Sequence, residues 1–194
     1  MQFTIEGNVL KNYDYDNQEE KVVIPDGIEE IGESAFYLRR KVKEIIIPDT
    51  VQKIGACAFS ECGIESIIIT DSVTELKQEA FEEARELKKV ILGNGITDLD
   101  SYLFRGCQNL EHLELSMNLY RVGYDSFAEC YSLKTIWVNG TEYRIRDDNA
   151  PEPIKKVYES LEKIRQRVQD YYDSGAMDEF EYIDYNIAGD GYSY

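Results

Sequence analysis

Apolar residues recur along this chain in columns with a regular period of about 23 residues, which is typical of a solenoid whose repeats bury their apolar sides against one another. One column consists of phenylalanines, and two further columns of Ile, Leu and Val keep the same spacing. The phenylalanines are Phe36, Phe59, Phe81, Phe104 and Phe127, and the numbers of successive members differ by 22 or 23. We therefore expect about five stacked repeats with an internal aromatic ladder.

Each repeat contains the same order of predicted elements. A Leu-x-x-Leu-x-Leu pattern, such as Leu110, Leu113 and Leu115, ends in the alternation of a short β-strand. A turn cluster such as Pro-Asp-Thr at positions 48–50 follows, and a second short strand is expected at positions 51–54. The Ala-Phe segment that comes next is expected to form a helical turn. The chain thus reverses direction within every repeat.

Three stretches share one consensus, which reads Ile-Pro-Asp-Gly-Ile-Glu-Glu-Ile-Gly-Glu-Ser-Ala-Phe from Ile24 to Phe36 and recurs at 47–59 and 69–81. They resemble the BspA-type, or Treponema pallidum-type, leucine-rich repeat family over roughly residues 3–145. Later repeats depart from the pattern, with Leu-Phe at 103–104 and Ser-Phe at 126–127, but keep its size and turn character. The resemblance implies a bacterial α/β leucine-rich-repeat solenoid whose strands line a concave face.

The repeat pattern divides the chain into two predicted parts. Residues 1–145 are expected to form the solenoid, with an N-terminal β-hairpin cap over residues 1–21. Residues 146–194 have a different composition, in which Pro151 and Pro153 precede an amphipathic helix over about 152–173. An acidic, aromatic tail follows the helix. The tail is expected either to dock as a strand at an open solenoid edge or to serve as a free ligand for a partner.

Composition and charge restrict the classes of partner. The formal charge of -17 would repel phosphate backbones and anionic lipid surfaces, so nucleic acid and membrane are poor candidates, although an acidic surface can also mimic DNA. No apolar run is long enough to span a membrane, and the first residues lack the pattern of a signal peptide. A cytoplasmic chain is therefore expected, or a cell-surface or secreted one if a leader has been removed.

Three of the four cysteines occupy one column, at the third position after the repeat phenylalanine. Cys62, Cys107 and Cys130 stand there, and Ala84 takes the equivalent place. Side chains in equivalent solenoid positions run parallel and do not converge, which disfavours both a metal site and a disulfide. We expect free, buried thiols in this column and a partly exposed Cys57, with no metal and no cofactor.

The sequence contains no recognisable catalytic constellation. Its one histidine, His112, lies in a predicted strand without a nearby Ser or Cys placed as a nucleophile. The Gly-Asn-Gly turn at 93–95 lacks the residues of a phosphate-binding loop, and the acidic stretch at 14–20 lacks the central Gly of a calcium loop. A non-enzymatic protein is the expectation.

The residues between the core positions of the predicted strands are unusually apolar. They are expected to face the concave surface, together with His112, and they are Ile46, Ile68, Ile91, Glu114 and Trp137. Isoleucine also favours strands without any functional reason. However, strands that are apolar on both faces are normally covered on both faces, and an uncovered row of this kind would be adhesive.

Two kinds of cover are compatible with the sequence. The first is the predicted helix, which is long enough to cross the solenoid and is expected to pack against it; its seam of Ile, Val and Leu could instead pair two chains as a short coiled coil. The second cover is an external protein or peptide. The leading hypothesis is a protein-interaction module that binds through the concave face. The alternatives are a structural protein dimerised by its helix and, as the family resemblance implies, an exported adhesin-like surface protein.

Overall fold

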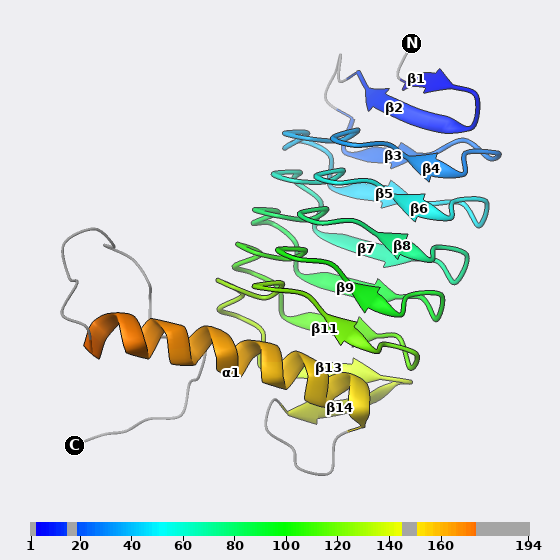
Figure 1. The fold of residues 1–194 in the computed structure, drawn as a ribbon. Helices are drawn as coiled ribbons and strands as arrows, with labels where there is room; N and C mark the ends of the chain where they lie inside the picture. The colour runs from blue at the N-terminus through cyan, green and yellow to red at the C-terminus, as the bar shows by residue number, and fades with distance from the viewer. Residues whose placement is uncertain (1–2, 15–18, 145–150, 174–194) are drawn as a thin grey trace.

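The computed structural model describes residues 3–14, 19–144 and 151–173 of the 194-residue chain. It confirms the predicted leucine-rich-repeat solenoid, a stack of similar turns that progresses from the N-terminus towards the long helix near the other end (Figure 1). Each turn contributes one strand to a long sheet, reverses, and then contributes a two-residue strand to a second row of strands. A run of tight turns leads into the next repeat.

The long sheet has seven strands, and all but the last are parallel because each repeat returns to the same side of the stack. Equivalent residues of successive repeats pair, as Leu113 does with Ile136. The parallel strands are β3 (Lys21–Val23), β5 (Glu44–Ile46), β7 (Ser66–Ile69), β9 (Lys89–Leu92), β11 (His112–Leu115) and β13 (Thr135–Val138). Strand β14 (Thr141–Arg144) folds back antiparallel on β13 and ends the sheet.

The second row of strands begins with an antiparallel hairpin of β1 (Phe3–Glu6) and β2 (Val9–Tyr13), and β2 pairs in parallel with β4 (Glu30–Ile31). This row continues with β6 (Lys53–Ile54) and β8 (Glu75–Leu76), and a separate pair is formed by β10 (Asp98–Leu99) and β12 (Arg121–Val122). The hairpin thus lies against the first turn of the solenoid.

The predicted aromatic ladder runs through the core. Ring centroids of successive phenylalanines lie 5.2–5.7 Å apart, with interplanar angles of 11–22°. The ladder extends one step further than predicted, because Tyr13 of the hairpin stacks on Phe36 at 5.2 Å. All five phenylalanines and Tyr13 are almost completely buried. Burial on this scale makes the ladder a principal contributor to stability.

The Ala-Phe segment does not form the predicted helical turn. Its N–H groups alternate between two kinds of acceptor. The N–H of Tyr37 donates to the carbonyl of Ser34 in the same turn (3.0 Å), whereas the N–H of Phe36 donates to the carbonyl of Ala58 in the next repeat (2.7 Å). Positive φ angles two positions before and two positions after each phenylalanine, as at Ser34 and Leu38, produce this alternation. Inter-repeat hydrogen bonds take the place of the i to i−4 bonds of a helix.

Helix α1 (Glu152–Asp173) packs against β12 and β13 at the end of the stack (Figure 1). Ile154, Val157 and Leu161 are each at most 1% exposed and belong to the same core as the repeats. The expected packing of the helix on its own solenoid is therefore present, but the helix crosses the end of the stack and does not run along it. It leaves a large part of the outer face of the seven-stranded sheet open.

Candidate protein-interaction face

Side chains of the seven-stranded sheet alternate between the core and solvent, as the period-2 geometry of a strand requires. Val22, Ile45 and Ile67 point inward and are at most 3% exposed. Their neighbours point outward, and four of these form a row that we call the outer apolar row: Val23, Ile46, Ile68 and Ile91. Val23 pairs in register with Ile46, and Ile68 pairs with Ile91, so the row crosses neighbouring strands side by side.

The outer apolar row is solvent-exposed over most of its length. Val23 is 59% exposed, Ile46 41% and Ile68 61%, whereas Ile91 is half-buried. Large β-branched side chains that stand open in adjacent positions are uncommon on a soluble surface and are typical of sites that another surface covers. Helix α1 does not provide that cover.

Charged side chains flank the row at the start of the strands. The amino group of Lys21 lies 2.8 Å from the carboxylate of Glu44, and Glu65 lies 3.8 Å from Lys43 and 3.3 Å from Lys88. These pairs join successive repeats, and each is substantially exposed, so they contribute little to stability. They border the apolar row with charges of both signs.

The other end of the face is a compact aromatic and polar cluster. The ring of His112 stacks on the indole of Trp137, with centroids 5.1 Å apart and an interplanar angle of 30°. Glu114 pairs in register with both Ile91 and Trp137, and its carboxylate accepts a hydrogen bond from the N–H of Gly140 at 3.2 Å. Glu114, His112 and Trp137 are all half-buried.

Burial lowers the pKa of His112, and the positive charge of Lys89 lowers it further against the opposing charges of Glu114 and Glu142. The lowered pKa therefore favours the neutral form of the imidazole at pH 7. The charged groups that shift this pKa are two carboxylates and one ammonium group. None of these three groups is a hydroxyl or thiol that the imidazole could activate as a nucleophile.

The structure thus places all six predicted site residues on one face, in two regions that adjoin where Glu114 pairs with Ile91. Ile46, Ile68 and Ile91 belong to the outer apolar row, whereas His112, Glu114 and Trp137 form the adjoining cluster. Val23 was not predicted, although it stands one repeat before Ile46 and continues the same column. The repeat period of the sequence could therefore have predicted that Val23 belongs to this column.

The cysteines lie away from this face and occur as free thiols. Cys62, Cys107 and Cys130 are buried, as expected for their column. The thiol of Cys107 lies 3.1 Å from the backbone carbonyl of Phe81, and the thiol of Cys130 lies 3.1 Å from the backbone carbonyl of Phe104. Burial raises the pKa of the partly exposed Cys57 to about 11, and Glu79, at 3.3 Å from the sulfur, adds to the rise. Across residues 3–14, 19–144 and 151–173, no three potential metal ligands lie together.

Within the same ranges, none of the helices combines the length and the apolar composition that crossing a membrane requires.

Known structures show the same architecture. A leucine-rich repeat protein from Bacteroides ovatus is 30% identical over 62% of this chain and 38% of its own, with a TM-score of 0.50. The pneumococcal vaccine antigen PcpA shares the fold at 18% identity, over 78% of this chain and 54% of its own, with a TM-score of 0.59. The chain therefore corresponds to only part of the length of either protein.

No curated protein matches the sequence significantly. The decisive comparison is with a family model, the BspA type leucine rich repeat region, which matches in six copies over residues 9–148. These residues include every strand from β2 to β14 and all six predicted site residues. The chain belongs to the BspA-type leucine-rich repeat family.

Proposed function

We propose that this chain is a protein-interaction module, whose partner packs on the outer apolar row of the seven-stranded sheet. The observation that carries the proposal is the exposure of Val23 and Ile46, which pair in register, and of Ile68 on the next strand. Covering such a row removes apolar surface from water at about 25 cal/mol per Å2, which is the main driving force of association. The repeat architecture of the family supports a binding role over a catalytic one.

The geometry of the row defines the chemistry of the partner. Four side chains at a strand spacing of about 4.8 Å extend over about 14 Å, so the partner presents an apolar ridge or segment of at least that length. The exposed ion pairs of Lys21 with Glu44 and of Lys88 with Glu65 flank the row. A partner with polar groups on both sides of its apolar centre fits this border, in the manner of an interface with an apolar core and a polar rim.

The aromatic cluster gives the face a second region of contact. Tryptophan is enriched among the residues that dominate binding energy, and Trp137 is already held in place by the ring of His112. We assign Trp137 and His112 to an apolar contact with the partner, and Glu114 to a polar contact at the boundary between the two regions.

The helix-mediated dimer is the less favoured alternative, because Ile154, Val157 and Leu161 of the seam are buried within the chain itself. Adhesion at a cell surface, which membership of the family also suggests, would use the same face on an exported protein. Fractionation of the source cells distinguishes a surface-exposed protein from a cytoplasmic one.

Matched variants test the proposal. The wild type, Ile68→Glu and Met117→Glu are used to capture proteins from lysate of the source cell; Met117 is 49% exposed and lies in a turn outside the outer apolar row. A partner of the row is recovered by wild type and Met117→Glu, and its recovery by Ile68→Glu falls about tenfold or more, since a buried unpaired charge costs well over about 1.4 kcal/mol. Equal recovery by all three proteins would place the binding site elsewhere.

A further inference from the structure

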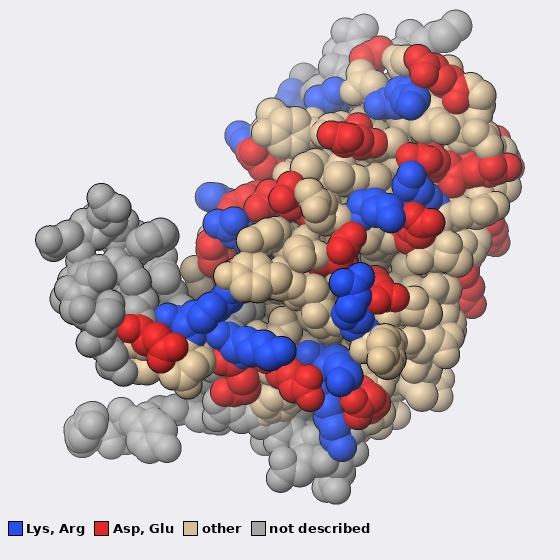
Figure 2. All heavy atoms as spheres, viewed as in Figure 1, with Lys and Arg blue, Asp and Glu red and all other residues tan. Residues whose placement is uncertain are grey.

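An open groove of about 690 Å3 lies between helix α1 and the segment that contains β12. Tyr120, Arg121 and Tyr124 line it from the solenoid, and Lys156, Lys163 and Arg167 line it from the helix. The groove shares no residue with the outer apolar row. Basic side chains gather along this junction, whereas acidic side chains are spread over much of the visible surface (Figure 2).

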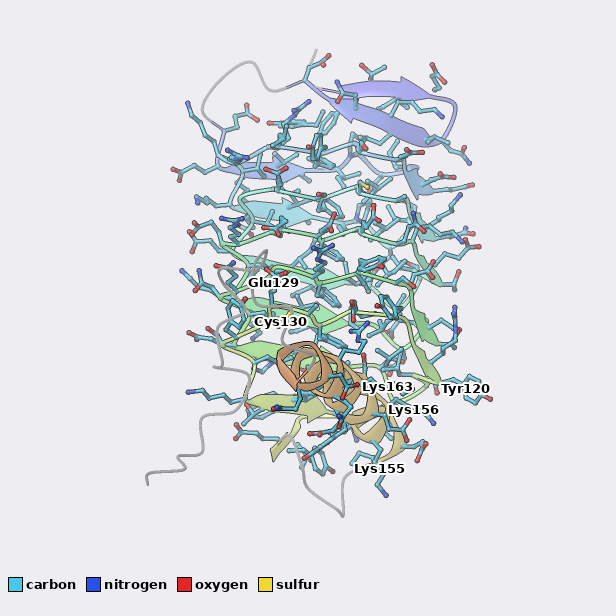
Figure 3. The ribbon with its side chains drawn as sticks, turned by 60° about the vertical axis from the view of Figure 1, so that its left-hand side comes forward. Tyr120, Glu129, Cys130, Lys155, Lys156 and Lys163 are labelled. Atoms are coloured by element: carbon cyan, nitrogen blue, oxygen red, sulfur yellow. The ribbon has the colours of Figure 1, made fainter. Side chains whose placement is uncertain are left out.

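The groove is basic in a chain whose formal charge is -17. Four cationic side chains line it, against the carboxylates of Asp125 and Glu159. Arg121 and Arg167 are held by ion pairs with Asp98 and Asp125, and Lys156 lies 3.2 Å from Glu152. Lys163 makes no ion pair within the part of the chain that the structure describes. It lies on the same side of α1 as Lys156, towards Tyr120, whereas Lys155 points away (Figure 3).

Exposed aromatic rings form the other component of the groove. Tyr120 is 76% exposed and Tyr124 is 56% exposed. The guanidinium group of Arg167 lies over the Tyr124 ring, 4.3 Å from its centre, and Tyr124 forms a T-shaped pair with Tyr102, with ring centroids 5.6 Å apart. The arrangement places a cation over one face of an aromatic ring. Such a surface suits a ligand that carries both carboxylates and aromatic side chains.

The chain contains a segment with this chemistry immediately after α1. Residues 174–194 include five acidic side chains and no Lys, Arg or His, and their aromatic residues are Phe180, Tyr182, Tyr185, Tyr192 and Tyr194. From Lys156 to the end of α1 at Asp173 the helix covers about 26 Å, at about 1.5 Å per residue. The segment can extend to about 70 Å, so it is long enough to turn back and follow the groove.

We propose that the groove between α1 and β12 is a docking site for the acidic, aromatic segment of the same chain, residues 174–194. Carboxylates of the segment pair with Lys163 and Lys156, and its aromatic rings pack on Tyr120 and Tyr124. The covalent connection gives the segment an effective concentration on the order of millimolar, so weak individual contacts are sufficient. The interaction weakens with salt, because the charges involved are exposed.

From its sequence alone, this segment is expected to pair with an open solenoid edge or to serve as a free ligand for a partner. Both expectations concern residues that lie outside the described ranges.

Carbodiimide cross-linking of the full chain tests the proposal directly, because the reagent joins a lysine amine only to a carboxylate that lies next to it. An equal mixture of unlabelled and 15N-labelled chains is treated and mapped by mass spectrometry after chymotryptic digestion. We expect Lys163 and Lys156 to be joined to Asp178, Glu179 or Glu181 of the same isotope, and Lys155 to be joined to them much less. Links between chains of different isotope, links from Lys155 at the same level, or no links to the segment would each overturn the proposal.

Limited proteolysis with a protease that cleaves after Glu provides a second readout. Lys163→Glu is expected to accelerate cleavage at Glu179 and Glu181 by about two- to fivefold, which corresponds to the loss of an exposed ion pair. Lys155→Glu makes the same change of charge outside the groove and is the matched control. Equal acceleration by the two variants would show that charge in general, and not the groove, protects the segment, and would reject the proposal.

Discussion

The α-carbon of Gly63 lies directly against the backbone of Arg40, whose carbonyl oxygen would be 1.9 Å from a β-carbon at position 63. Gly63 belongs to the repeat between Phe59 and Phe81, which is one residue shorter than its neighbours. The shorter connection brings the backbone of this repeat close to the backbone of the preceding repeat. There the N–H of Gly63 donates to the carbonyl of Arg39 at 3.2 Å. The shorter repeat therefore depends on glycine here.

Replacement of Gly63 by alanine is expected to lower the free energy of unfolding by about 3 kcal/mol or more, because the obstructing atoms are backbone and cannot rotate away. Gly27→Ala is the control, since Gly27 has a φ of 87° but no atom within 4 Å of an added β-carbon. Its cost should be limited to the left-handed backbone, about 1–2 kcal/mol. Urea unfolding followed by circular dichroism compares the two, and equal losses would contradict the role assigned to the contact.

The parts of the fold that repeat could be predicted from the sequence, including parts that were overlooked. Tyr13 stands one repeat before Phe36, and Val23 stands one repeat before Ile46, so both follow columns that the sequence displays. Tyr13 was missed because the hairpin that contains it lacks the rest of the consensus. The period determines which side chains share a column, and the strand geometry determines whether that column faces the core or solvent.

The position of α1 could not be predicted in the same way. The alternating spacing of its apolar side chains, at every third or fourth position, predicts that one face is buried but does not identify the surface that buries it. Two apolar surfaces were available, the outer apolar row and the open end of the last repeat. The helix packs on the end, where Ile154 and Leu161 join the core. The basic groove is a product of this contact, since it contains residues from two parts of the chain that no local pattern connects.

Cys57 is expected to be a poorly reactive thiol although it is partly exposed. Burial and the neighbouring carboxylate of Glu79 raise its pKa to about 11, so at pH 8 only about one thiol in a thousand is the reactive thiolate. Alkylation of the folded chain should be slow at pH 8 and accelerate up to about pH 11. Glu79→Gln removes the negative charge and should shift the rate profile to lower pH, whereas Glu86→Gln, whose carboxylate is not among the groups that raise this pKa, should leave it unchanged.

A rate profile for Cys57 centred near the ordinary thiol pKa, and unaffected by Glu79→Gln, would contradict the environment described for this residue. Tandem mass spectrometry of the alkylated protein identifies the modified site, because the other three cysteines are buried and should react only after unfolding.

His112 is expected to titrate below its ordinary pKa of about 6.5. Burial is the main cause, and Trp137 stacks on the imidazole, so Trp137→Ala should raise the pKa, and Lys89→Ala should raise it by a smaller amount. Because the folded chain binds the proton less readily than the unfolded chain, His112 reduces the free energy of unfolding as the pH falls from about 7 through 6.5. As the chain has one histidine, a single imidazole resonance in a proton NMR titration reports the pKa.

The control for this titration is Lys134→Ala, which removes a cation that is not among the groups that shift His112. It should leave the midpoint unchanged. A wild-type midpoint at or above about 6.5, or an equal response to Lys89→Ala and Lys134→Ala, would contradict the stacked and partly desolvated arrangement.

Leu161 connects α1 to the core of the last repeat, so Leu161→Ala is expected to destabilise the C-terminal end of the solenoid by about 2–5 kcal/mol. The exposed Lys155 lies on the same helix, and Lys155→Ala should change stability by no more than about 0.5 kcal/mol. In a repeat protein each unit contacts only its neighbours, so the loss should affect the final repeats first. Hydrogen exchange should show faster opening in β13 than in β5 for Leu161→Ala. Unchanged exchange in β13 would mean that the packing of α1 does not stabilise the solenoid.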